Sequence, residues 1–322
     1  MIAVSAFIEA SVGLSVAQWK KLVAEFGSMR YAGVYICDHF TPPGDLRPDN
    51  LEAVVALAYL ADHSQGIHFG ALVSPVSFRD PIMLARQAMA IDDLSGGRMI
   101  LGLGAGWQDR EHTMFGYTLG DVKTRMARFE EALHVITLLY KSEEPVTFEG
   151  KFYQIRDAQF MPRPLRSGGP PIMIGGTGVK RTLALTARYA DIWNGGGKTP
   201  DEYREYNAIL DGYLVKEGRP ASAVRRTLMV NGFTYRNDAE LTRRLDWYRR
   251  FRPVGDGLSN ADTVAAIEAR SPAWLMGTPD VVAAKIEALG AAGVEEVMFQ
   301  WFDPDDVDGL RLISDEVIAS VK

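Results

Sequence analysis

The residues best suited to do chemistry are Asp38 and His39, which directly follow the apolar run GVYIC at residues 33–37. An imidazole can donate or accept a proton near neutral pH, and a nearby carboxylate can bias its tautomer. Neighbouring side chains on a strand point in opposite directions, so we expect one of the two to face a pocket and expect no direct bond between them. The alternative is structural, with Asp38 capping a turn and His39 packing against Phe40.

Other apolar runs also stop at polar, aromatic or glycine-rich clusters, namely LVSP (72–75), LGAGW (103–107), IGGTG (174–178) and DIWNGGG (191–197). In IGGTG, bare backbone N–H groups before a helix could hold a phosphate, although many such turns are only tight connections. Small residues before Trp107 would let a flat ring lie against the backbone. Glu111 and His112 either line that pocket or pair with basic neighbours. Ser74 precedes proline, which favours an extended backbone with an exposed hydroxyl.

The elements that must position these residues alternate between strand and helix, which is typical of a parallel sheet with crossover helices. Helices are predicted over 15–29, from 51, from 81, over 122–140, from 179, over 200–217 and from 279. Strands are predicted at 2–8, 33–37, 68–74, 99–104, 170–176, 190–194, 227–233 and 296–301. Eight such runs favour a TIM (β/α)8 barrel over an open doubly wound sheet, and the loops after barrel strands converge on one face.

Two connections are longer than the others and are interpreted as insertions after the fourth and seventh strands. The first contains a predicted hairpin, VTFEGKFYQIRDAQF, at residues 146–160. The second contains a region, 252–274, that we expect to be irregular. Together with residues 110–120, which are also expected to be irregular, it is expected to form the walls around a substrate.

Length and composition limit the remaining classes of function. The 322 residues, 47% of them hydrophobic, suit one domain over 1–322. A net charge of −6 with scattered basic residues argues against nucleic-acid binding. Apolar stretches too short for a membrane span and a start unlike a signal peptide indicate a cytoplasmic protein. The single cysteine, Cys37, excludes an internal disulfide and is expected to be a small buried residue.

Two further classes of site are disfavoured. His68 begins its predicted strand, which places it at the opposite mouth of the barrel from Asp38 and His39, and the sequence has no HxxxH or HExxH pair. We therefore expect no metal site. A Ser-His-Asp hydrolase would require a GxSxG elbow, which is also missing.

Four segments taken together resemble the bacterial luciferase-like flavin or deazaflavin oxidoreductases, especially the branch that uses coenzyme F420. They are CDHF (37–40), PVSFRDPIMLARQAMAIDDLSGGRMILGLGAGWQDREHTMFG (75–116), PPIMIGGTG (170–178) and GTPDVVAAKIEALGAAGVEEVMFQ (277–300). The resemblance covers about residues 3–299, and the second segment is the most specific. It implies a barrel that holds an isoalloxazine-like ring at its C-terminal mouth, with the phosphate-bearing tail along the loops of the fourth and fifth strands.

The resemblance also implies roles for single residues. Asp38 and His39 match a pair that flanks the deazaflavin and the substrate, and both are expected to be catalytic. Ala71 and Leu72 match a pair that often forms a non-proline cis peptide behind the ring. The other residues expected to bind the cofactor are Ser74, Ala105, Gly106, Trp107, Gly175, Gly176, Thr177 and Gly178.

Trp107 departs from the pattern of the sugar-phosphate dehydrogenases of this branch, which carry an acid at that position. A sugar-phosphate substrate is therefore disfavoured, and an apolar or aromatic one is favoured. The expected activity is hydride transfer between F420 and an unidentified small organic substrate, with His39 as proton donor or oxyanion stabiliser. The alternatives are an FMN-dependent monooxygenase supplied by a separate reductase, and a barrel that stores or carries the cofactor without turnover. The family also implies a homodimer.

Overall fold

The computed structural model describes residues 2–44, 49–249 and 257–321. Within these residues, eight parallel strands form a closed ring, because β1 pairs with both β2 and β12 and β10 pairs with both β9 and β12. In ring order they are β1 (Ala3–Ile8), β2 (Gly33–Ile36), β3 (His68–Ala71), β5 (Met99–Gly104), β8 (Ile172–Gly175), β9 (Ile192–Gly196), β10 (Arg225–Thr234) and β12 (Glu296–Trp301). The predicted TIM barrel is confirmed.

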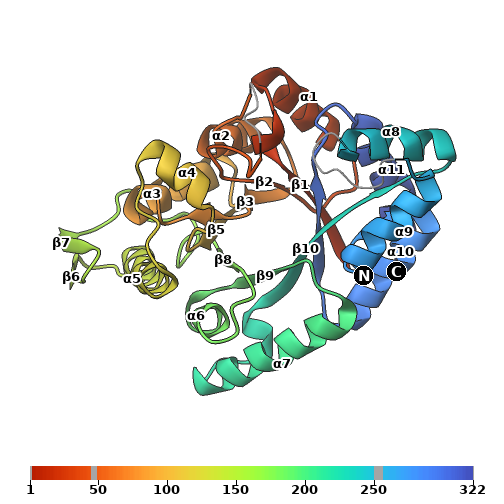
Figure 1. Cartoon of the computed structure of the whole chain (residues 1–322). Coiled ribbons are helices and arrows are strands. Elements are labelled where there is room, and N and C mark those ends of the chain that lie inside the picture. Colours follow the sequence, from red (N-terminus) through yellow and green to blue (C-terminus); the bar gives the residue numbers. More distant parts are fainter. Residues whose placement is uncertain (1, 45–48, 250–256, 322) are drawn as a thin grey trace.

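Helices surround the ring (Figure 1). Those that connect successive strands are α1 (Val16–Phe26), α2 (Ala53–His63), α3 (Pro81–Leu94), α5 (Val122–Lys141), α6 (Thr182–Tyr189), α7 (Pro200–Lys216) and α10 (Pro279–Ala291). The side chains of Ser15, Asp80 and Thr199 cap the first turns of their helices by accepting backbone N–H groups. The start predicted for α6 at residue 179 is wrong, because residues 177–181 form a non-helical connection before Thr182.

The third barrel strand is interrupted where the sequence predicts one continuous strand. β3 ends at Ala71, a cis peptide bond joins Leu72 to Val73, and β4 (Ser74–Pro75) then pairs with β5. The cis bond expected between Ala71 and Leu72 therefore lies one residue later. The backbone N–H of Leu72 still donates to Ile36 of β2, so the chain leaves the ladder only after this residue.

Both long connections contain additional structure. After β5 the chain forms α4 (Asp109–Phe115), α5 and the predicted hairpin of β6 (Val146–Glu149) and β7 (Gln154–Ala158), which projects from the barrel (Figure 1). After β10 it forms α8 (Asp238–Arg249), α9 (Asn260–Arg270) and β11 (Leu275–Gly277). The expectation of an irregular region over 252–274 is wrong for α9, whose first turn Ser259 caps; residues 252–256 lie outside the described residues. The same expectation for residues 110–120 is wrong for residues 110–115, which belong to α4.

The buried apolar residues form two clusters. The larger one fills the barrel and the space beneath its helices. The smaller one lies among α8, α9, β10 and β11, which together we call the cap, and comprises Phe233, Leu241, Leu245, Ile267, Trp274 and Met276. Cys37 is buried, as predicted. Across the described ranges, no helix has the length and apolar character needed to cross a membrane.

The N-terminal mouth of the barrel holds a buried ionic cluster around Glu296. Nε2 of His68 lies 2.9 Å from Oε1 of Glu296, Nη2 of Arg225 lies 3.1 Å from Oε2, and the Ser5 hydroxyl donates to the same carboxylate. Burial by itself would raise the pKa of Glu296, but the hydrogen bond and charge of His68, together with Arg225 and Ser5, lower it. His68 thus lies at the mouth opposite His39, as its place at the start of a strand predicts.

Candidate active site

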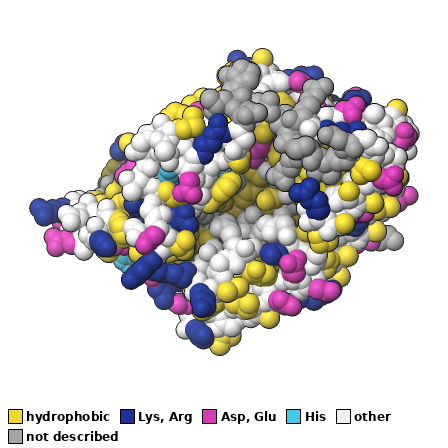
Figure 2. Space-filling view, in the orientation of Figure 1, with side chains coloured by type: hydrophobic (Ala, Val, Ile, Leu, Met, Phe, Trp, Pro, Cys, Tyr) yellow, Lys and Arg dark blue, Asp and Glu magenta, His cyan; other side chains and the backbone are white. Residues whose placement is uncertain are grey.

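A pocket with a volume of about 290 Å³ opens at the C-terminal mouth of the barrel. It draws residues from the ends of β1, β2, β5, β8, β9 and β10, which is where parallel barrels place their catalytic groups. Figure 2 shows a hollow at the centre of one face of the molecule, with hydrophobic side chains in its depth. The chain therefore brings several distant segments to one enclosed space.

His39 lines this pocket, whereas its neighbour Asp38 does not. Nδ1 of His39 lies 2.9 Å from Oε1 of Glu111, and the second oxygen of Glu111 accepts the backbone N–H of Phe40 at 2.9 Å. A carboxylate accepts hydrogen bonds, so Nδ1 of His39 carries the proton and Nε2 is left for a ligand. The ring of Trp107 meets the imidazole edge to face, with 5.7 Å between the ring centroids.

The surroundings of His39 favour its charged form. Burial by itself would lower the pKa of His39, but the hydrogen bond to Glu111 and the negative charges of Glu9, Glu111 and Asp38 raise it above its usual value. Glu111 is only 1% exposed and is therefore shielded from bulk water, while the His39 side chain remains 20% exposed to the pocket. The imidazole can thus supply a proton at a higher pH than an isolated histidine.

Asp38 lies behind the pocket in a polar cluster. Its carboxylate accepts hydrogen bonds from the hydroxyl of Ser74 at 2.5 Å and from Nε and Nη2 of Arg79 at 3.0 and 2.6 Å. Arg79 also binds Glu52 at 2.5 Å, and these carboxylates raise the pKa of Arg79 although burial opposes them. Asp38 and Ser74 therefore fasten the ends of β2 and β4 to the start of α3, and neither lines the pocket.

One wall of the pocket consists of bare backbone packed around Val73. A Cβ atom added at Gly104 would lie 2.7 Å from a methyl group of Val73, and one added at Gly175 would lie 3.0 Å from the other. Gly106 has a φ of +82°, and a Cβ there would lie 2.2 Å from the Ser77 hydroxyl. Glycine is required at this wall because any side chain would collide with it. The wall therefore presents glycine backbone and the Val73 side chain to the pocket.

The loop after β8 forms a second bare surface at the pocket rim. Gly176 has a φ of +126°, its N–H donates to Asn194, and its carbonyl accepts the indole N–H of Trp193 at 2.9 Å. Thr177 lines the pocket beside it. Lys180 and Arg181 follow in the same connection, and Nη2 of Arg181 lies 3.3 Å from Oε2 of Glu130. The N–H of Gly176 is therefore already bonded within the protein, and Thr177 is the polar side chain that this loop presents to the pocket.

Seven of the residues predicted to bind a cofactor line the pocket: His39, Leu72, Gly106, Trp107, Gly175, Gly176 and Thr177. Asp38, Ala71, Ser74, Ala105 and Gly178 are not among its lining residues. Glu111, for which lining and pairing were open alternatives, does both. Sequence reasoning missed Phe7, Val73, Pro75, Gly104, Asn194, Gly196 and Met229 as lining residues.

A recognisable signal existed for only some of the missed residues. Asn194 and Gly196 belong to DIWNGGG, whose abrupt polar end marks a strand terminus at the mouth. Phe7 and Met229 are apolar strand residues with no chemical signature. In the described part of the chain, no group of three or more His, Cys, Asp or Glu side chains is placed to hold a metal ion.

Comparison with known proteins places this geometry in context. A family model described as luciferase-like monooxygenase matches residues 11–296. The chain is 27% identical over 310 residues to an F420-dependent glucose-6-phosphate dehydrogenase of Kineococcus radiotolerans, covering 90% of this chain and 88% of that protein.

Two solved structures share the fold. An F420-dependent secondary alcohol dehydrogenase in complex with an F420-acetone adduct aligns with a TM-score of 0.82 at 16% identity, covering 99% of this chain and 98% of that one. The oxygenating constituent of 3,6-diketocamphane monooxygenase of Pseudomonas putida, in complex with FMN, aligns with a TM-score of 0.75 at 19% identity, covering 100% and 99%.

Proposed function

Because this chain belongs to the luciferase-like monooxygenase family, we propose that it is an oxidoreductase that uses the deazaflavin F420 to exchange a hydride with a small organic substrate. The observation that carries the proposal is the position of His39. Its imidazole, polarised by Glu111, faces a pocket whose other wall is glycine backbone. The F420-dependent relative that matches nine-tenths of the chain supports the choice of cofactor.

The residues present fit a deazaflavin. The glycine surface around Val73 would lie against the flat ring, and Gly176 and Thr177 would hold the phosphate of the tail. When bound, F420 supplies the hydride chemistry at its ring carbon, while the protein supplies position and electrostatics.

His39 would manage the proton that accompanies the hydride. Glu111 holds Nδ1, so Nε2 can take a proton from a substrate hydroxyl during oxidation or return one to a carbonyl oxygen during reduction. The raised pKa of His39 keeps the donor form populated to a higher pH than in an isolated histidine. Glu111 also fixes the orientation of the ring, because its second oxygen is held by the backbone N–H of Phe40, the residue after His39.

The pocket entrance favours an apolar or aromatic substrate over a sugar phosphate. Trp107 is 60% exposed at the mouth, and the apolar side chains of Phe7, Leu72 and Met229 line the pocket with it. Stacking on an exposed indole stabilises flat apolar molecules. The charged groups that a sugar phosphate would need are not among the lining residues, apart from His39 and Glu111.

An FMN-dependent monooxygenase is the second candidate, because a member of this fold has been solved with FMN bound. In that case a separate reductase would supply reduced FMN. The test is titration of the purified protein with F420 and with FMN, followed by oxygen uptake with each reduced form. Tighter binding of F420 without oxygen uptake is expected. Equal or tighter binding of FMN with oxygen uptake would replace the first proposal by the second.

A further inference from the structure

A second, narrower pocket lies at the same mouth of the barrel, between the cap and the end of β12. We call it the aromatic slot, because its walls include Phe233, Trp247, Tyr248, Trp274, Trp301 and Phe302. Its volume of about 50 Å³ corresponds to a few water molecules, roughly the space of one planar ring. Walls of this composition favour a flat apolar group.

Two buried donors at this slot lack hydrogen-bond partners among the described residues. Arg244 is 6% exposed; its Nε and Nη2 bind Asp306 at 2.9 and 3.4 Å, but Nη1 has no hydrogen bond and lies 3.6 Å from Glu240. Trp301 is 4% exposed, and its indole N–H is also unpaired. Buried donors are normally satisfied, so these two indicate a place for an acceptor atom.

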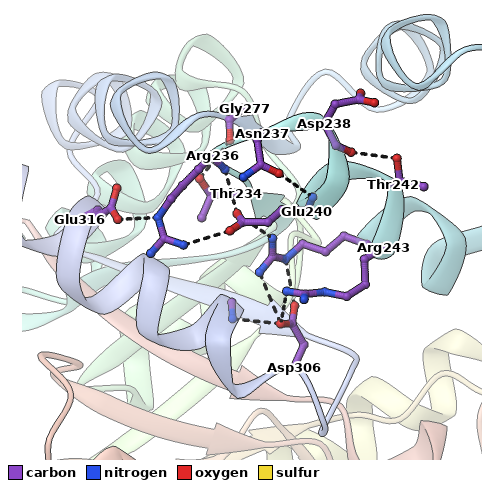
Figure 3. A network of polar contacts seen from close by, with 12 residues as sticks. Thr234, Arg236, Asn237, Asp238, Glu240, Thr242, Arg243, Gly277, Asp306 and Glu316 are labelled. Carbon is purple, nitrogen blue, oxygen red and sulfur yellow. Dashed lines mark hydrogen bonds and ion pairs between the residues drawn. The ribbon is translucent and has the colours of Figure 1, made fainter.

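The charges around the slot favour a neutral acceptor over an anion. Arg243 and Arg244 both contact Asp306, so one carboxylate already faces two guanidinium groups. Figure 3 shows this carboxylate, with Glu240 bound by Arg236 beside it. Asp303 adds further negative charge to the lining, and burial and the neighbouring Asp306 and Asp305 raise its pKa. An anionic ligand would meet these carboxylates, whereas a carbonyl or hydroxyl oxygen would not be repelled.

The slot adjoins the pocket that contains His39. On β10, Met229 lines the pocket and Phe233 lines the slot. On the neighbouring strands, Phe7 and Gln300 are register partners, and each lines one of the two spaces. Four residues of extended strand span about 13 Å. A single molecule of two or three rings could therefore occupy both.

We infer that the aromatic slot binds the distal part of the substrate, an uncharged planar ring that carries a carbonyl or hydroxyl oxygen, while the reacting carbon lies beside His39. The oxygen accepts hydrogen bonds from Nη1 of Arg244 and Nε1 of Trp301, and the aromatic side chains enclose the ring. This inference rests on the proposed function, because only an enzyme of that kind would bind a substrate in the slot. The binding event itself does not require F420.

Equilibrium dialysis with three naphthalene probes tests the inference. The probes are 2-acetylnaphthalene, which carries a neutral oxygen, 2-ethylnaphthalene, which carries none, and 2-naphthoate, which is anionic. We expect 2-acetylnaphthalene to bind about tenfold more tightly than either of the others, as one additional buried hydrogen bond predicts. Trp247→Ala should weaken its binding by a similar factor. Tyr213→Ala, which removes a half-buried aromatic ring from α7, is the matched control and should leave binding unchanged.

Arg244→Lys keeps a positive charge near Asp306 but removes the unpaired donor. It should reduce the affinity for 2-acetylnaphthalene toward that for 2-ethylnaphthalene, with the indole N–H of Trp301 retaining part of the difference, and the affinity for 2-ethylnaphthalene should not change. Tighter binding of 2-naphthoate, or wild-type affinity in Trp247→Ala, would overturn the inference. If Arg244→Lys does not fold by circular dichroism, the result for Trp247→Ala decides. Titration of the wild-type protein with F420 distinguishes failure of this inference from failure of the proposed function. If F420 does not bind but the probes bind as expected, the proposed function is rejected and the assignment of the aromatic slot stands.

Discussion

The imidazole of His39 and the carboxylate of Glu111 lie 2.9 Å apart although 72 residues separate them in the chain. His39 follows β2, whereas Glu111 belongs to α4, in the long connection after β5. The hydrogen bond at the barrel mouth therefore joins the end of β2 to a helix of a different connection.

Replacing His39 by alanine should reduce turnover strongly and change cofactor affinity little. Loss of a positioned acid or base costs about 10²–10⁴-fold in rate, while the glycine surfaces that would hold the ring are unchanged. Steady-state kinetics and F420 fluorescence titration measure the two quantities. An unchanged kcat would remove His39 from proton transfer.

Replacing Glu111 by glutamine should lower the pKa of His39, because the neutral amide no longer stabilises the imidazolium. The limb of the pH profile of kcat/KM that reports loss of the His39 proton should consequently move to lower pH. Asp109→Asn removes the same charge from an exposed position on α4 and is the matched control. Equal profiles for Glu111→Gln and the wild type would contradict this role.

Valine at position 176 should weaken cofactor binding without unfolding the protein. Gly176 has a φ of +126°, which a β-branched residue rarely adopts, so the loop after β8 must shift. Gly212→Ala on α7 is the control, because a Cβ there meets nothing within 4 Å. The measurements are the dissociation constant for F420 and the circular dichroism spectrum. Unaltered affinity would show that the phosphate lies elsewhere.

Asp38→Ala should act mainly on stability. Removing the carboxylate leaves the Ser74 hydroxyl and part of the Arg79 guanidinium without their buried acceptor, which costs about 1–3 kcal/mol. Glu52 continues to bind Arg79, which limits the loss. Urea unfolding gives the free energy, and kcat per folded molecule should fall far less than in His39→Ala. A loss of kcat equal to that of His39→Ala would restore Asp38 as a catalytic residue.

The ionic cluster at the N-terminal mouth should contribute to acid unfolding. The folded-state pKa of Glu296 lies below its ordinary value of 4.5, so its stabilisation is complete above that value and is lost as the pH falls through the lowered pKa. In Glu296→Gln this part of the acid dependence should disappear. Glu144→Gln, at an exposed position, is the control and should unfold like the wild type. Parallel curves for all three proteins would contradict the assignment.

The barrel could be predicted because its strands are apolar runs that end at glycine, proline or polar residues. Met99–Gly104 is such a run, and its predicted bounds match β5. Helix starts with a capping side chain and proline, such as Asp80 and Pro81, were equally readable. Strand periodicity predicted that one of Asp38 and His39 faces a pocket, and the fold shows that it is His39.

The features that could not be predicted depend on contacts between segments that are distant in the sequence, and local sequence patterns carry no information about such contacts. α8 has few apolar residues and was not predicted; it is stabilised by packing of Leu241 and Leu245 on Phe233 and Trp274. The interruption after Ala71 follows from the pairing of β4 with β5, not from a residue of unusual propensity. From the sequence, Glu111 could either line the pocket or pair with a basic neighbour, and only the fold shows its contact with His39.

The small cluster of Phe233, Leu241, Leu245, Ile267, Trp274 and Met276 has its own hydrophobic packing, distinct from that of the barrel. Apart from Phe233 on β10, its residues lie outside the eight-stranded ring, so substitutions among them can accumulate with little effect on that ring. Over evolutionary time, a lineage with this arrangement can exchange one substrate for another through its cap while the redox machinery beneath is inherited intact.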